Sequence, residues 1–351
     1  MSKIGSSLLV PSVQELAKQS ISQVPDRYHV PKQEDTPNTC SFPQVPIIDL
    51  NKLLSQDPFE LHKLDNACKE WGFFQSVKLG VQDLFNLPIE EKKKLWQKRG
   101  HMEGFGQLFV VSDNQKLDWA DLFIINTLPS YARDPNLFPN IPQPFRDNLD
   151  NYSIQLGKLC TTMIQHMEMA LKIKPNELVE IFEDISQLMR MNYYPPCPQP
   201  EKVIGLSPHS DAAGLTLLLQ ANEVEGLQIR KDGMWIPITP LSNAFIVNVG
   251  DILEIVTNGI YRSIEHRATI NTQKERISIA AFHRPQMNKV IGPNASLVTD
   301  EKCALFKRIS VADYYKKFFS RQLQGKSLLD DIRIQRDDCV DKSVEDRDGI
   351  E

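Results

Sequence analysis

The C-terminal half of this 351-residue chain is a succession of short β-prone runs, and this pattern constrains the fold more than any other feature. The runs lie at residues 189–194, 215–220, 226–230, 234–238, 244–250, 252–256 and 276–282. Pro-Pro, Asp-Gly, Gly-Asp and Asn-Gly pairs separate several of them, as turns between strands require. Many short strands joined by turns are typical of an antiparallel sandwich or jelly roll. We therefore predict an α+β protein with a mostly β core, a double-stranded β-helix (jelly roll), and a helical N-terminal region.

The segments outside these runs have a different periodicity. Apolar residues recur at helical spacing over residues 59–71 and, as a long amphipathic stripe, over residues 149–171. Pro88 is placed to begin a charged helix. Residues 45–50 and 72–77 have the pattern of short strands, residues 31–43 that of a linker, and residues 310–333 that of a polar helical segment.

Four regions follow from these patterns. Residues 1–186 form a helical and mixed region that packs on the barrel, and residues 187–290 form the jelly-roll core. Residues 291–334 form a C-terminal helical extension. The charged stretch 335–351 is predicted to be a disordered tail.

Composition narrows the class of protein. The hydrophobic fraction of 41% and the charged fraction of 24% are ordinary for a soluble globular protein. A net charge of −5 argues against a nucleic-acid or acidic-membrane partner, because both require a basic face. The six cysteines form no CxxC pattern, and no long apolar run or signal-peptide pattern is present. We expect a cytoplasmic monomer with free thiols and a small-molecule partner, which binds neither nucleic acid nor membrane.

Two histidines and one aspartate stand out as candidate metal ligands. His209 and Asp211 lie in the run SPHSDAAGLT, and residues two apart on an extended strand face the same way. His266 lies several strands later, in YRSIEHRA, and a jelly roll can bring such strands together. Two histidines and one carboxylate on one face of an octahedron leave positions open for other ligands. That is the arrangement of non-haem Fe(II) oxygenases.

Arg276 and Ser278 complete this constellation. They lie two residues apart in the run RISIAAF, so a strand directs both side chains to one face. A guanidinium beside a hydroxyl is suited to bind a carboxylate, such as the distal end of 2-oxoglutarate. An isolated HxD or a single arginine has little specificity, since the first arises by chance and the second is more often a surface ion pair. Their order on neighbouring predicted strands favours the functional interpretation.

Five histidines remain, at positions 29, 62, 101, 166 and 283. Structural or surface roles are expected for them. Because His283 adjoins the last predicted strand, the alternative is that it lines a pocket.

Longer stretches connect the chain to a known family. CKEWGFFQ at 68–75, MRMNYYPPCPQP at 189–200, GLSPHSDAAGLTLLLQ at 205–220 and FIVNVGDILEIVTNGIYRSIEHRA at 245–268 are examples. The chain resembles the plant Fe(II)- and 2-oxoglutarate-dependent dioxygenases, which include anthocyanidin synthase, flavonol synthase and the opium-poppy O-demethylases. Within them it is most similar to the senescence-related (SRG1-like) branch. The resemblance spans roughly residues 8–333. It implies Fe(II), 2-oxoglutarate as co-substrate, O2, and ascorbate as a supporting reductant.

The resemblance also assigns roles to particular residues. It implies that the iron ligands are His209, Asp211 and His266. It implies that Arg276 and Ser278 bind the distal carboxylate of 2-oxoglutarate. Tyr194 and Asn192 would make further contacts in the same site. Phe282 matches an aromatic residue that stacks on flat substrates, and Phe105 lies near a position at the substrate mouth. For Tyr194 and Asn192 a turn role is the alternative, and for the two phenylalanines a core role is.

One segment departs from the family pattern. After Gln75 the family continues with the triplet NHG and a helix, whereas this chain runs directly into LFNLP. Roughly a dozen or more residues are therefore missing from that stretch. Loss of a packed helix face costs several kcal/mol, which is comparable with the whole stability of a domain.

Three functions compete at this stage. The first is an oxygenase that hydroxylates or O-demethylates a small aromatic plant specialised metabolite and releases succinate and CO2. The second is a catalytically impaired jelly-roll homologue that only binds a ligand, which the shortened segment favours and the intact constellation disfavours. The third is a zinc hydrolase that uses the same three ligands, in which Arg276 would have no evident role.

Overall fold

The computed structural model describes residues 7–19, 21–31, 45–71, 73–74, 81–241, 244–299 and 302–334. Most of the predicted linker at 31–43, the shortened segment after Gln75 and the predicted tail at 335–351 lie outside the described residues. Among the described residues, no helix combines the length and apolar character needed to cross a bilayer. The described cysteines, Cys68, Cys160, Cys197 and Cys303, are unpaired thiols.

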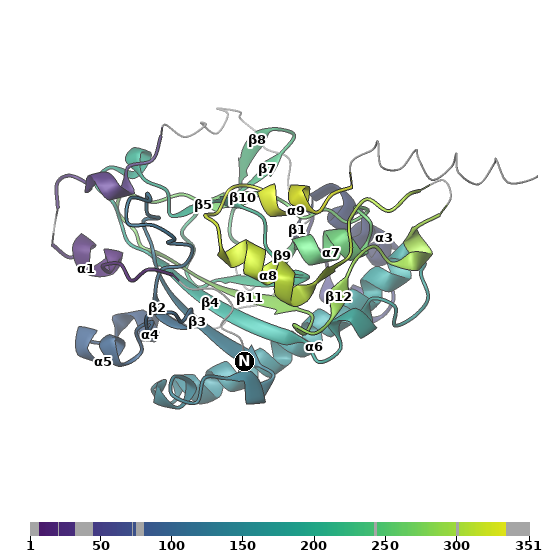
Figure 1. Cartoon of the computed structure of the whole chain (residues 1–351), viewed down its shortest axis with the longest axis horizontal. Coiled ribbons are helices and arrows are strands. Elements are labelled where there is room, and N and C mark those ends of the chain that lie inside the picture. The colour runs from purple at the N-terminus through teal and green to yellow at the C-terminus, as the bar shows by residue number, and fades with distance from the viewer. Residues whose placement is uncertain are drawn as a thin grey trace, which may run out of the picture.

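Two antiparallel sheets form the centre of the molecule (Figure 1). The seven-stranded major sheet has the order β1 (Phe73–Phe74), β9 (Phe245–Val249), β6 (Leu215–Gln220), β11 (Arg276–Arg284), β4 (Ser186–Tyr194), β3 (Asp121–Leu128) and β2 (Gly104–Gly106). The four-stranded minor sheet has the order β5 (Leu206–His209), β10 (His266–Ala268), β7 (Leu227–Lys231) and β8 (Met234–Pro237). A third pair joins β12 (Val290–Ile291) to β13 (Ile309–Ser310). The predicted jelly-roll core is confirmed.

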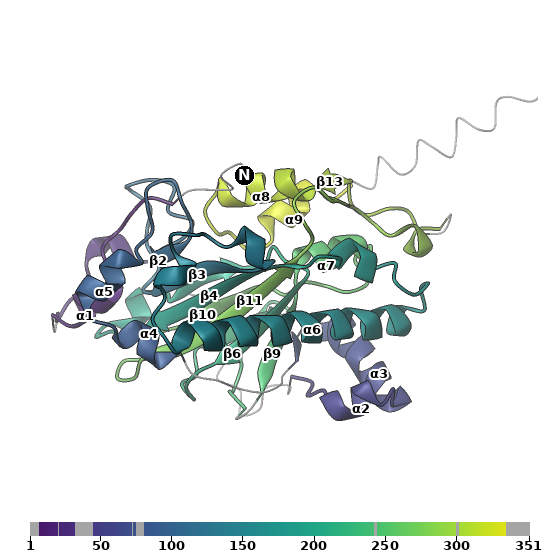
Figure 2. The same ribbon diagram turned by 90° about the horizontal axis from the view of Figure 1, so that it is seen from below.

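Helices surround the sheets. They are α1 (Val13–Ala17), α2 (Leu50–Leu54), α3 (Pro58–Asn66), α4 (Gln82–Asn86), α5 (Ile89–Lys94), α6 (Phe145–Leu171), α7 (Asp251–Val256), α8 (Val311–Phe319) and α9 (Ser327–Asp331). The apolar stripe of α6 buries Leu149, Leu156 and Met163 in the main core. Figure 2 shows α6 running along the face of the major sheet. The predicted long helix is therefore confirmed, and it covers one face of the sheet.

The strands β4 and β11 are buried on both faces, and their alternation separates two environments. Met189 and Met191 of β4 join the main core with α6. The intervening Arg190 and Asn192, like Tyr194, line a pocket between the two sheets. The site therefore lies on the face of the major sheet that α6 does not cover.

Two local predictions were wrong. Residues 252–256, predicted as a strand, belong to α7, in which every residue is buried. A short run that is apolar except for Glu254 cannot distinguish a buried strand from a buried helix, because neither shows its period clearly. Residues 45–50 form no strand, because the Asp49 carboxylate accepts from the backbone N–H groups of Asn51 and Lys52 and caps α2.

Residues 310–333, predicted as a polar helical segment, contain helices as expected, but the segment is not uniformly polar. They form two helices, α8 and α9, which Gly325 separates at a positive φ of 50°. The first helix is amphipathic and buries Tyr314, Tyr315 and Phe319. The apolar residues of α8 fall on one side because of helical spacing, while its lysines face outward.

Candidate active site

His209, Asp211 and His266 converge at the minor sheet. His209 is the last residue of β5, Asp211 follows two residues beyond the strand, and His266 begins β10. The antiparallel pairing of β5 with β10 places His209 directly opposite His266. The Nε2 atoms of His209 and His266 lie 3.7 and 3.5 Å from Asp211 Oδ1. All three side chains are buried, and their ligand atoms lie within 4.8 Å of one another.

Backbone carbonyls orient both imidazoles. His209 Nδ1 lies 2.8 Å from the carbonyl oxygen of Ser207, and His266 Nδ1 lies 3.1 Å from that of Ile264. With a proton on Nδ1 donated to each carbonyl, the Nε2 lone pairs point at the shared space. Burial, followed by the neighbouring His266, lowers the pKa of His209 to about 3. A neutral His209 is therefore available as a metal ligand at neutral pH.

The Asp211 carboxylate is held in its ionised form. Burial raises its pKa, but the adjacent histidines and the Asn248 amide outweigh this effect and lower it overall. Asn248 on β9 donates from Nδ2 to Asp211 Oδ2 at 2.9 Å, which leaves Oδ1 turned to the histidines. One anionic oxygen and two imidazole nitrogens form the donor set that suits non-haem Fe(II).

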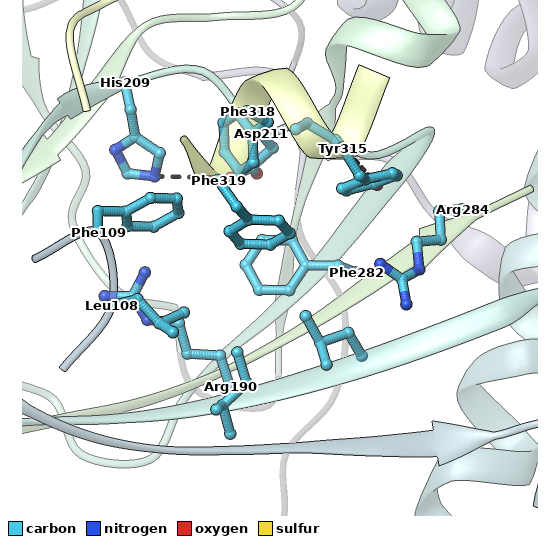
Figure 3. Close-up of a pocket in the computed structure, with 13 residues that line it drawn as sticks. Leu108, Phe109, Arg190, His209, Asp211, Phe282, Arg284, Tyr315, Phe318 and Phe319 are labelled. Atoms are coloured by element: carbon cyan, nitrogen blue, oxygen red, sulfur yellow. Dashed lines mark hydrogen bonds and ion pairs between the residues drawn. The ribbon is translucent and has the colours of Figure 1, made fainter. Parts of the chain in front are cut away.

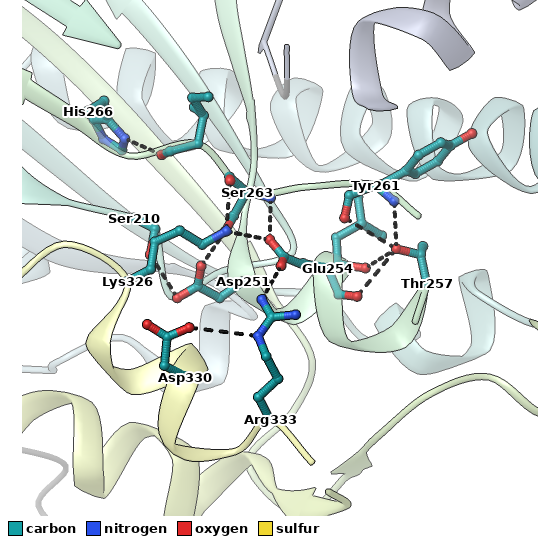
Figure 4. A network of polar contacts seen from close by, with 12 residues as sticks. Ser210, Asp251, Glu254, Thr257, Tyr261, Ser263, His266, Lys326, Asp330 and Arg333 are labelled. Atoms are coloured by element: carbon teal, nitrogen blue, oxygen red, sulfur yellow. Dashed lines mark hydrogen bonds and ion pairs between the residues drawn. The ribbon is translucent and has the colours of Figure 1, made fainter. Parts of the chain in front are cut away.

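A polar network holds the loop between the ligands (Figure 4). Asp251 at the start of α7 accepts from the hydroxyls of Ser210, Ser263 and Tyr314 at 3.1, 2.6 and 3.0 Å. Its backbone N–H donates to the carbonyl oxygen of Asp211 at 2.8 Å. Burial raises the pKa of Asp251 to about 6.

The same network reaches the C-terminal segment. Glu254, also on α7, accepts from Lys326 Nζ at 2.6 Å and from Arg333 at 3.0 Å. Because α7 also carries Asp251, these ion pairs connect the segment after α8 to the loop of the metal ligands. The C-terminal extension is thus part of the support of the site.

Arg276 provides a buried cation in the pocket between the sheets. Its side chain is 3% exposed, and it donates to Gln220 Oε1. Its Nε is shielded from solvent without a hydrogen-bond partner, and none of the described carboxylates forms an ion pair with it. A buried guanidinium without an ion pair is unfavourable, so Arg276 is suited to bind an anion in this pocket.

The neighbours of Arg276 fit the same anion. Strand pairing sets Arg276 opposite Tyr194, whose ring lies 5.1 Å from the guanidinium carbon, and Ser278 opposite Asn192. Asn192 Nδ2 donates to Ser278 Oγ at 3.3 Å, while Asn192 Oδ1 is buried without a partner. These four residues and the triad line one pocket. The structure therefore brings together all seven residues that the sequence placed at the iron and co-substrate positions.

An apolar pocket adjoins His209 and Asp211 (Figure 3). Aromatic and aliphatic side chains form most of its wall: Leu108, Phe109, Ile124, Leu188, Phe282, Phe318 and Phe319. Phe109 stacks on Phe319 with 5.6 Å between ring centroids and 12° between planes. Phe282 lines both this pocket and the one that contains Arg276.

Phe105 does not line this pocket. Its ring packs in the core against Phe85 and Phe123, with ring centroids 5.8 and 4.8 Å away. It lines a separate cavity, and its predicted position near the substrate mouth stays a prediction. His283 is also a core residue, bonded to Gln187 at 2.9 Å, and burial lowers its pKa to about 4.

Sequence reasoning missed Arg190, Asn248 and the aromatic residues of α8. Strand parity could have found Arg190, since it lies two residues before Asn192 on β4. Asn248 and Phe319 gave no comparable signal, because their positions depend on how distant segments pack.

Comparisons with known proteins match this geometry. Residues 185–285 match the model of the 2OG-Fe(II) oxygenase superfamily, and residues 45–141 match that of the non-haem dioxygenase in morphine synthesis N-terminal region. Protein SRG1 from Arabidopsis thaliana is 54% identical over 349 residues, covering 94% of this chain and 98% of that protein. Oxoglutarate-dependent flavonoid 7-O-demethylase 1 from Ocimum basilicum is 54% identical over 348 residues, covering 95% of this chain and 93% of that protein.

A solved structure resembles the whole fold. The crystal structure of JOX2 in complex with 2OG, Fe and JA superposes with a TM-score of 0.84 at 35% identity. The match covers 93% of this chain and 98% of that chain.

Proposed function

Because the chain belongs to the 2OG-Fe(II) oxygenase family, we propose that it uses Fe(II), 2-oxoglutarate and O2 to hydroxylate or O-demethylate a small aromatic plant metabolite. The observation that carries this proposal is the buried His209–Asp211–His266 triad between an arginine pocket and an aromatic pocket. The enzyme class, a 2-oxoglutarate-dependent dioxygenase, follows from the family. The residue roles and the substrate are the proposed part.

His209 Nε2, His266 Nε2 and Asp211 Oδ1 would hold the iron. Arg276 and Ser278 would bind the distal carboxylate of 2-oxoglutarate, with Tyr194 and Asn192 beside it. When bound, iron and 2-oxoglutarate supply the activation of O2, with conversion of 2-oxoglutarate to succinate and CO2. The protein contributes open coordination, orientation of both substrates and a pocket from which apolar side chains exclude water.

The aromatic pocket supports a flat substrate. Phe282 lies between the co-substrate pocket and the apolar pocket, so a ring held against it would lie beside the metal ligands. The flavonoid O-demethylase among the relatives favours an O-methylated aromatic compound. In such a reaction the methyl carbon is hydroxylated and leaves as formaldehyde. One O2 and one 2-oxoglutarate are consumed, and a phenol, formaldehyde, succinate and CO2 are released.

The proposal is tested by aerobic incubation with Fe(II), 2-oxoglutarate and ascorbate against a panel of O-methylated and unmethylated plant aromatics. Succinate formation reports turnover, and formaldehyde distinguishes demethylation from hydroxylation. We expect His209→Ala to abolish CO2 release from labelled 2-oxoglutarate. His101 is exposed on the surface, so His101→Ala serves as the control and should retain CO2 release. Undiminished turnover in His209→Ala would contradict the assignment of His209 as an iron ligand.

The same assay separates the two rival functions. A binding-only homologue would consume no 2-oxoglutarate, although the intact triad and the buried Arg276, which forms no ion pair with a described carboxylate, argue against it. A zinc hydrolase would form no succinate, and its activity would be equal under air and argon.

A further inference from the structure

Arg190 is a buried cation near the triad whose charge the proposed co-substrate does not require. Its side chain is 6% exposed, and its Nε is shielded from solvent without a hydrogen-bond partner. No described residue forms a contact ion pair with it. Burying an unpaired guanidinium is costly, so a ligand is the natural partner.

Asp118, whose pKa the charge of Arg190 lowers, does not satisfy this charge. Burial raises the pKa of Asp118, and hydrogen bonds from Ser207 and the positive charge of Arg190 partly offset that rise. The Asp118 carboxylate, however, accepts from Ser207 Oγ at 2.6 Å and makes no contact ion pair with Arg190. Asp118 therefore leaves the guanidinium available.

The position of Arg190 directs it to the substrate. It lines the aromatic pocket as well as the inter-sheet pocket, and Figure 3 shows it reaching from β4 toward Phe109. Strand pairing sets it opposite Ala280. The co-substrate has its own cation in Arg276, four strand pairs along β11 from Ala280.

The other arginine of the aromatic pocket is already engaged. Arg284 donates to Ser186 Oγ at 3.2 Å and to Asn126 Oδ1 at 3.3 Å, and its guanidinium carbon lies 4.8 Å from the Tyr315 ring centroid. Arg190 is thus the cation of this pocket that lacks such partners among the described residues.

We infer that the substrate is a flat aromatic molecule with an anionic oxygen group, a carboxylate or an ionised phenol, which Arg190 binds while the phenylalanines enclose the ring. The inference rests on the proposed function and narrows its substrate class. A planar guanidinium suits a carboxylate by paired hydrogen bonds. The free space among the lining side chains is about 40 Å³, so Phe109, Phe318 and Phe319 must move to admit the ring.

The test measures binding without turnover. Wild-type protein with Fe(II) and 2-oxoglutarate under argon is titrated calorimetrically with 2-naphthoate, 2-naphthamide and 2-naphthol. If the partner is a carboxylate, we expect naphthoate to bind at least about tenfold more tightly than its neutral amide. If the partner is a phenolate, we expect naphthol to bind as its anion, which is detected by the absorbance of the naphtholate. The first result identifies a carboxylate as the partner, and the second identifies a phenolate.

Substitutions then assign the preference to Arg190. Arg190→Gln is expected to weaken binding of the anion by about 10- to 100-fold and that of naphthamide by less than about threefold. Arg190→Lys, which retains the charge but not the planar fork, is expected to fall between them and serves if the glutamine variant does not fold. The exposed Arg308→Gln is the matched control and should bind like wild type.

Three results would overturn the inference. The first is that the wild type binds naphthoate and naphthamide equally and binds naphthol in its neutral form. The second is an equal loss of affinity for the anion and for naphthamide in Arg190→Gln. The third, from a separate titration with 2-oxoglutarate, is that Arg190→Gln loses affinity for 2-oxoglutarate alone. The last would make Arg190 a co-substrate residue. Because no turnover is involved, an anion preference is measurable even if the succinate assay of the proposed function fails.

Discussion

Asn248 is the residue through which a small change should alter metal binding most directly. It is 2% exposed, and its Nδ2 donates to Asp211 Oδ2 at 2.9 Å. Asn248→Leu keeps the approximate volume but removes this donor. A hydrogen bond to a charged group contributes roughly 1.5–3 kcal/mol, which corresponds to about 10- to 150-fold in an equilibrium constant. Substitution of a residue that orients a ligand typically weakens metal affinity by about 10- to 100-fold, which agrees.

The assay is anaerobic Fe(II) titration with competition from a chelator, accompanied by thermal unfolding of the metal-free protein. We expect Asn248→Leu to weaken Fe(II) binding by about 10- to 100-fold. The matched control is Asn222→Leu, because Asn222 Nδ2 donates to the carbonyl of Glu275 at 2.8 Å and touches no metal ligand. Affinity within twofold of wild type in Asn248→Leu, or the same loss in Asn222→Leu, would refute the reasoning.

Two further predictions follow from buried charges. Arg276→Gln should raise the KM for 2-oxoglutarate by at least about 30-fold, since it leaves a buried carboxylate unpaired at a cost of roughly 2–5 kcal/mol; an unchanged KM in succinate assays would contradict the clamp. The pKa of Asp251 is about 6 in the folded protein and about 4 in the unfolded chain. Since the unfolded chain loses this proton at lower pH, the free energy of unfolding should fall as pH rises from about 4 to about 6, by about 3 kcal/mol at most. Urea unfolding of metal-free wild type and Asp251→Asn at both ends of the window measures the difference, and identical pH dependence in the two proteins would rule the effect out.

Strand parity carried most of the site prediction. Arg276 with Ser278 and Tyr194 with Asn192 lie two residues apart on β11 and β4, and the structure pairs them across the two strands. Alternation along a strand is a local property, so sequence spacing alone established which residues share a face. Asp211 shows the limit of this reasoning, because it lies beyond the end of β5, and the loop held by Asp251 sets its direction.

Prediction failed where local pattern carries no period. Residues 252–256 of α7 resembled a strand in the sequence because four of the five are apolar and the run is too short to show a helical period. The charged residues around α8 concealed an amphipathic helix whose Tyr315 and Phe319 face the aromatic pocket.

The sequence by itself determined the chemistry of the centre: the identity of the three candidate ligands, the arginine clamp and the jelly-roll strands that carry them. Only the tertiary structure decided what surrounds that chemistry. Phe109 and Phe319 come from distant parts of the chain and stack on each other, and the charge of Arg190 meets no partner among its described neighbours. The physical reason is that the alternation of side chains along a strand is local, whereas the wall of a pocket depends on how separate loops and helices pack over the barrel.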